Sequence, residues 1–170
     1  WHGHPETDMT RFIAPTLIAL LLATTAHAAP DDKVKEIVVE LDLTAVTNPA
    51  AARRYATIAT DLQGAIAARL VDRIDEKGAK ILVDLSEVEL SNTFTEATGA
   101  ADTRLVGTVN IYADAAVDMP MAYELTVDVN QAVPFFPVEI DRATLTASSD
   151  EFYKAMIAAF AEGVVKRLDE

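Results

Sequence analysis

The densest group of carboxylates in the chain is formed by Asp84, Glu87 and Glu89. If the strand around them continues, Glu87 and Glu89 share one face. Glycoside hydrolases place two carboxylates across a sugar ring and raise the pKa of one of them. This group is therefore the candidate for hydrolysis of glycans or cell-wall material. Two observations favour solvated surface carboxylates instead: the chain is rich in Asp and Glu, and it has few aromatic residues to stack on a sugar.

A second candidate site is the segment 133–137, Val-Pro-Phe-Phe-Pro, which suits a contact with a protein partner. Adjacent aromatic residues on a strand point to opposite faces, so one ring would leave the core. An exposed aromatic ring next to amide side chains is typical of a partner-binding surface. The alternative is that a helix or the loop 91–103 buries both rings. The expected contact residues are Phe94, Asn130, Gln131, Phe135 and Phe136.

Residue types that are missing exclude several classes of enzyme. The chain has no cysteine, and its three histidines and single tryptophan all precede residue 29. A chain that begins near residue 29 therefore has no imidazole or thiol for a nucleophilic triad or a zinc site. No glycine-rich phosphate loop is present, and Asp114 and Asp118 lack the spacing of a calcium loop. We expect no metal and no cofactor.

Residues 9–28 have the pattern of a secretory signal peptide. A positive start at Arg11 precedes an apolar run, and Ala26-His27-Ala28 fits a small-residue cleavage site. The run of about 12 apolar residues is shorter than a spanning helix needs. Residues 1–8 are interpreted as a leader that precedes the initiator, with His2 and His4 as part of it rather than as metal ligands. The expected destination is the periplasm in a cell with two membranes, and otherwise the extracellular space.

Residues 29–170 are expected to form one domain with a strongly negative charge. They contain 25 Asp and Glu residues against 13 Lys and Arg residues. This charge disfavours binding to phosphate backbones and to anionic lipid surfaces. We therefore expect no nucleic-acid partner and no stable membrane insertion after cleavage.

Hydrophobic periodicity predicts a two-layer α+β fold. Alternating patterns predict strands over 34–43, 79–85, 104–113, 119–130 and 135–147. A cap at Asn48-Pro49 opens a long amphipathic helix that ends before Gly78, and Ser148 caps a second one. We expect a mixed, mostly antiparallel sheet of four to five strands with both helices on one face. The first two strands should be parallel, because a helix connects them.

In its order of elements the chain resembles the small exported α/β domains that act as accessory or assembly factors in bacterial envelopes. This resemblance, together with the signal peptide, implies a soluble exported envelope protein. The sequence favours a non-enzymatic role, in which the protein binds a partner protein or a small ligand. The alternative is a carboxylate-based hydrolase of glycans or cell-wall material.

Overall fold

The computed structural model describes residues 1–2, 33–87, 89, 103–113, 120–139, 146 and 149–170. The predicted signal peptide, Phe94, Asp114, Asp118 and the predicted cap Ser148 lie outside these residues. The described elements are β1 (Val34–Glu40), α1 (Pro49–Arg54), α2 (Ile58–Arg69), the 3-10 turn η1 (Val71–Arg73), β2 (Ala79–Leu85), β3 (Arg104–Tyr112), β4 (Met121–Asp128), α4 (Val129–Ala132), the 3-10 turn η3 (Val133–Phe135) and α5 (Asp150–Leu168).

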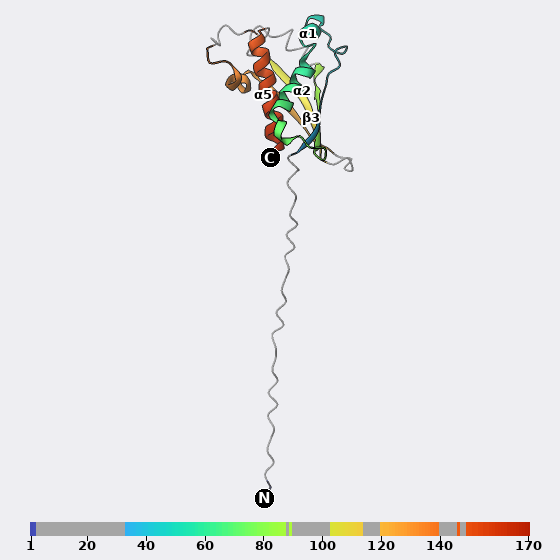
Figure 1. Ribbon diagram of the computed structural model, residues 1–170, viewed down its shortest axis with the longest axis vertical. Helices are drawn as coiled ribbons and strands as arrows, with labels where there is room; N and C mark the ends of the chain where they lie inside the picture. The colour runs from blue at the N-terminus through green and yellow to red at the C-terminus, as the bar shows by residue number, and fades with distance from the viewer. Residues whose placement is uncertain (3–32, 88, 90–102, 114–119, 140–145, 147–148) are drawn as a thin grey trace.

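The four strands form one mixed sheet in the order β1-β2-β3-β4. β1 and β2 are parallel, whereas β3 is antiparallel to both β2 and β4. The helices α2 and α5 pack against each other and lie side by side on one face of this sheet (Figure 1). The predicted two-layer α+β architecture is confirmed, including the parallel pairing of the first two strands.

The core lies between the sheet and this pair of helices. Alternate residues of each strand face the helices and are buried, among them Ile37, Val83 and Val109. Phe160 of α5 is completely buried and sits close to Gly107 of β3. A Cβ atom at Gly107 would lie 3.1 Å from the Phe160 ring and 3.1 Å from the backbone oxygen of Asp84. The close approach of α5 to the sheet therefore depends on a residue without a side chain at this position.

The predicted long helix is interrupted and ends early. Asn48 caps it as expected, because its side-chain oxygen accepts hydrogen bonds from the backbone N–H groups of Ala50 and Ala51. The helix breaks after Arg54 and resumes as α2. It stops at Arg69, so the prediction that the helix continues past Ile74 was wrong, and Ile74 is 54% exposed. Ile74 instead forms an isolated β-bridge with Val34, which holds the segment that follows η1 against β1.

The predicted strand 119–130 is present as β4 but ends two residues early, and the start of the predicted strand 135–147 was wrong, because residues 135–139 do not form a strand. β4 ends at Asp128, whose carboxylate accepts hydrogen bonds from the backbone of Asn130 and Gln131. The Gln131 side-chain oxygen accepts a hydrogen bond from the backbone N–H of Asp128, which completes a capping box. This pair of bonds starts α4, and η3 continues the turn through Phe135. Residues 140–145 and 147 of the last predicted strand lie outside the described part.

The last helix begins one residue later than predicted. The side chain of Ser149, rather than that of Ser148, accepts the hydrogen bond from the backbone N–H of Phe152. α5 then runs to Leu168 and buries one continuous face. None of the helices in the described part of the chain combines the length and the apolar composition of a membrane-spanning helix.

Candidate functional site

The face of the sheet opposite the helices presents a row of polar side chains that crosses all four strands. Glu40 of β1 pairs with Asp84 of β2, Asp84 pairs with Thr108 of β3, and Thr108 pairs with Glu124 of β4. All four residues are exposed. Because paired residues on neighbouring strands point to the same face, three carboxylates stand in one line around the Thr108 hydroxyl.

This row borders a hollow of about 620 Å³. Its wall is mostly polar and comes from β2, β3, β4 and the segment that follows β2. The lining residues are Asp84, Leu85, Ser86, Glu87, Glu89, Arg104, Val106, Gly107, Thr108, Glu124 and Thr126. A second hollow of about 460 Å³ adjoins it at the carboxyl ends of β1 and β2 and shares Asp84 and Glu87 with it. We call the first hollow, with the row that borders it, the sheet trough.

The carboxylates of the sheet trough differ in how they are held. Glu87 accepts a hydrogen bond of 2.9 Å from the backbone N–H of Asp42, which fixes it at the end of β1. Glu89 forms an ion pair of 2.6 Å with Arg104. Partial burial raises the pKa of Asp84, and the negative charges of Glu87 and Glu40 raise it further. Burial and the neighbouring negative charges therefore both make ionisation of Asp84 less favourable than that of a free carboxyl group.

The structure thus brings the three carboxylates that the sequence singled out to one hollow. Their catalytic role stays a prediction. Among the described residues, no three side chains of His, Asp or Glu are arranged to hold a metal ion. What the trough can do directly is attract positive charge, because its single arginine is already paired with Glu89.

The expected partner-binding rings do not lie on a strand. Phe136 is buried and packs against Phe152 of α5, with ring centroids 6.0 Å apart. Phe135 is half-buried against the core, and the guanidinium of Arg69 lies 6.0 Å from its ring centroid. The turn α4–η3 directs both rings toward α5, so the premise that one ring leaves the core was wrong.

Asn130 and Gln131 are exposed on α4, next to these rings. The Gln131 side chain is used in the capping box with Asp128, so its amide already has a structural partner. The role of all five residues in partner binding is not tested by the fold.

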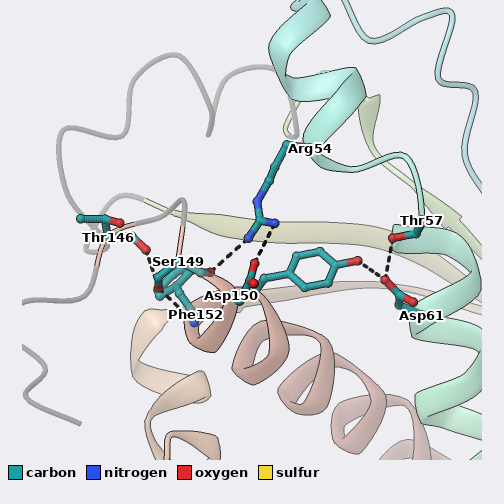
Figure 2. Close-up of polar contacts among 8 residues, drawn as sticks. Arg54, Thr57, Asp61, Thr146, Ser149, Asp150 and Phe152 are labelled. Atoms are coloured by element: carbon teal, nitrogen blue, oxygen red, sulfur yellow. Dashed lines mark hydrogen bonds and ion pairs between the residues drawn. The ribbon is translucent and has the colours of Figure 1, made fainter.

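A second group of polar contacts joins the ends of three helices (Figure 2). Arg54 of α1 donates hydrogen bonds to the Asp150 carboxylate at 3.2 Å and to the Ser149 carbonyl at 3.1 Å. The Tyr153 hydroxyl donates to the Asp61 carboxylate at 2.6 Å, and Thr57 donates to the same oxygen at 2.8 Å. These contacts tie α1 and α2 to the start of α5.

The Tyr153 phenol is a poor candidate for acid–base chemistry. Burial raises its pKa, and the hydrogen bond to Asp61 raises it further. The phenol is therefore neutral near pH 7 and acts as a donor. The Arg54 guanidinium stacks over the same ring, 4.9 Å from its centroid. We interpret this group as a structural connection between helices.

Sequence reasoning missed Glu40, Thr108 and Glu124 as members of the site. Each was assigned to a strand, but the register that aligns them depends on the pairing of strands far apart in the chain. A signal was present for Glu124, because it alternates with the apolar residues of the predicted strand 119–130. Combining the polar faces of all the strands would have pointed to one shared surface.

No protein-family model matches this sequence, and no curated protein is similar to it. Among solved structures, the chain is similar to the crystal structure of a "putative lipoprotein" from Caulobacter crescentus CB15. The two share 14% sequence identity, with a TM-score of 0.38, over 78% of this chain and 86% of the other. A likeness at this level supports no statement about function.

Proposed function

We propose that this chain is an exported, non-catalytic binding protein of the cell envelope, and that the sheet trough takes a positively charged ligand. Export is supported by the signal-peptide pattern of residues 9–28. The observation that carries the binding role is the row of Glu40, Asp84 and Glu124 across the sheet face opposite α2 and α5. Together with Glu87, these carboxylates give the surface a negative charge. The described cations Arg104 and Lys80 on this face form ion pairs with Glu89 and Glu36.

The raised pKa of Asp84 indicates how a bound cation would change the ionisation of this carboxyl group. Its carboxylate lies among like charges, and each of them makes the ionised form less favourable. A bound cation reverses this effect, because an opposite charge within about 4–6 Å favours the carboxylate. Ligand binding should therefore lower the pKa of Asp84, and binding should strengthen as the pH rises through that pKa.

The hydrolase alternative is supported by a specific observation and is kept as a second candidate. Partial burial and the charges of Glu87 and Glu40 raise the pKa of Asp84, which is the direction of shift found in a general acid, and Glu124 lies two strands away in register with it. Two strand spacings amount to about 10 Å between the backbones, close to the carboxylate separation of inverting glycosidases. None of the described residues that line the hollow is aromatic, which disfavours a sugar ligand.

The proposed function is tested with hexalysine as a probe, using residues 29–170 and isothermal titration calorimetry at low salt. The double variant Asp84→Asn, Glu124→Gln removes two charges from the trough. Exposed ion pairs contribute about 0.2–1 kcal/mol each, so we expect the affinity to fall about tenfold. The matched control is Glu76→Gln, Glu151→Gln, which removes the same charge from exposed positions outside the trough.

A control variant that weakens binding as much as the trough variant would contradict a localised site. Cleavage of soluble cell-wall fragments by the wild type, lost in Asp84→Asn alone, would favour the hydrolase instead.

A further inference from the structure

The sheet face opposite α2 and α5 carries a second row of residues beside the acidic one, apolar except for Asn110. Val38 of β1 pairs with Leu82 of β2, Leu82 pairs with Asn110 of β3, and Asn110 pairs with Ala122 of β4. Val38 and Leu82 are half-buried, and Ala122 is exposed. This row lies two residues along each strand from the acidic row, a distance of about 7 Å. The face therefore offers a negative stripe and, parallel to it, a stripe whose apolar members are Val38, Leu82 and Ala122.

We infer that this face docks an amphipathic α-helix of a partner protein, one that carries a lysine- or arginine-rich stripe beside an apolar stripe. This inference rests on the proposed function and names its ligand. The basic stripe of the partner helix is inferred from charge complementarity with the carboxylates, and its apolar stripe from the half-buried Val38 and Leu82 that it would contact. The partner would form a third layer on the sheet, opposite α2 and α5.

The backbone of the sheet explains why the ligand is a helix rather than an extended peptide. The inner strands β2 and β3 are paired on both sides, so the middle of the face has no free backbone groups to offer. An extended peptide lying on it would leave its own N–H and C=O groups without partners. A helix satisfies its backbone internally and presents only side chains.

The width of the face fits a short helix. Four strands span about 14 Å between the outer backbones, which is the length of about ten helical residues. Lysine side chains spaced three and four residues apart on such a helix line one stripe and can reach the carboxylates of Glu40, Asp84 and Glu124 together. Smaller cations can reach only part of the row.

The inference is tested with two synthetic 14-residue peptides of the same Lys, Leu and Ala composition. One places Lys and Leu on adjacent stripes when helical, and the other has the same residues in scrambled order. We expect the first peptide to bind residues 29–170 at least tenfold more tightly than the second, and to gain helical circular dichroism on binding. Hexalysine is the common reference.

The protein variant for this test is Ala122→Lys, which places a bulky cation on the apolar row at an exposed strand position. This variant should bind the amphipathic peptide at least tenfold more weakly than the wild type does. Thr60→Lys, at an exposed position of α2, adds the same charge outside the sheet face and should weaken the peptide much less. Thermal denaturation of both variants establishes that they are folded.

Each of the following results would contradict a defined part of the proposal. Equal binding of the two peptides would overturn the helical partner and leave the cationic ligand in place. Absence of binding by both peptides and by hexalysine would overturn the proposed function as well. A wild-type dimer that Ala122→Lys dissociates in analytical ultracentrifugation would show that a second copy occupies the face. Peptide binding that appears only after residues 91–101 are shortened would assign the face to the chain's own segment.

Discussion

Two glycine-to-alanine substitutions should change stability in opposite directions. At Gly107, a new Cβ would lie 3.1 Å from the Asp84 backbone oxygen, 3.1 Å from the Phe160 ring and 3.2 Å from a Leu85 methyl group. At Gly64, in the exposed middle of α2, it would meet no atom within 4 Å. The same substitution is therefore made at a crowded position and at an open one.

The contacts around Gly107 leave little room for adjustment. The Asp84 oxygen belongs to the backbone of an inner strand, and Phe160 is completely buried. Overpacking of this kind costs about 1–3 kcal/mol, offset by about 0.5–1 kcal/mol from the lower chain entropy of alanine in the unfolded state. We expect Gly107→Ala to destabilise the domain by about 1–2 kcal/mol. Gly64→Ala should stabilise it by about 1 kcal/mol, since alanine is the better helix former.

The assay is urea and thermal denaturation of residues 29–170, followed by far-ultraviolet circular dichroism because the only tryptophan is Trp1. For a domain of this size the difference between the two variants amounts to roughly 5–12 °C in Tm. Replacing Phe160 by Leu in the Gly107→Ala background should recover part of the loss, measured as a double-mutant coupling. A Gly107→Ala protein as stable as the wild type would refute the packing of α5 on β3 described above.

Three further predictions concern a titrating group, a helix contact and export. The raised pKa of Asp84 means that the folded state binds this proton more tightly than the unfolded state does. The resulting contribution to folding stability is fully present below the ordinary pKa of 3.8 and is lost as the pH rises through the folded-state pKa. Asp84→Asn should therefore stabilise the protein more at pH 7 than at pH 3 in urea titrations, and an opposite pH trend would contradict the repulsion. Tyr153→Phe removes the hydrogen bond to Asp61 and should lower the free energy of unfolding by about 1 kcal/mol. An unchanged urea midpoint would mean that this hydrogen bond contributes no net stability. Expression in a bacterial host with both membranes should yield a periplasmic protein whose intact mass corresponds to a start at Ala29, and material that retains residues 9–28 would contradict cleavage.

Local patterns were sufficient to predict the strands and the helical layer. In β4, the alternation of Tyr123, Leu125 and Val127 with polar residues identifies the face that packs against α5. The Asn48-Pro49 cap likewise marks the start of α1. In these segments the hydrophobic period and the capping residues favour the same structure that the tertiary packing requires.

The errors occurred where short-range hydrogen bonds override a hydrophobic pattern. Alternation continues through Val129, yet the carboxylate of Asp128 captures two backbone N–H groups and turns the chain into α4. The spacing of Asp128 and Gln131 is that of a capping box and was the available signal. Because this turn redirects Phe135 and Phe136 toward α5, an error in local structure became an error about the candidate site.

The candidate site itself was only partly predictable. Asp84, Glu87 and Glu89 are neighbours in the sequence, so their clustering was visible. Glu40 and Glu124 join them only through the register of β1 on β2 and of β3 on β4. Register depends on contacts between distant parts of the chain, which one sequence does not specify residue by residue.

The measurement that tests the central claim most directly is a titration of ¹⁵N-labelled residues 29–170 with hexalysine, followed in amide correlation spectra. A ligand that binds the sheet face opposite α2 and α5 should shift the amides of Glu40, Asp84, Thr108 and Glu124 in a saturable manner. The outer faces of α2 and α5 should stay unchanged. Shifts that concentrate on those helices, or that spread evenly over all acidic residues, would contradict a binding surface on the sheet.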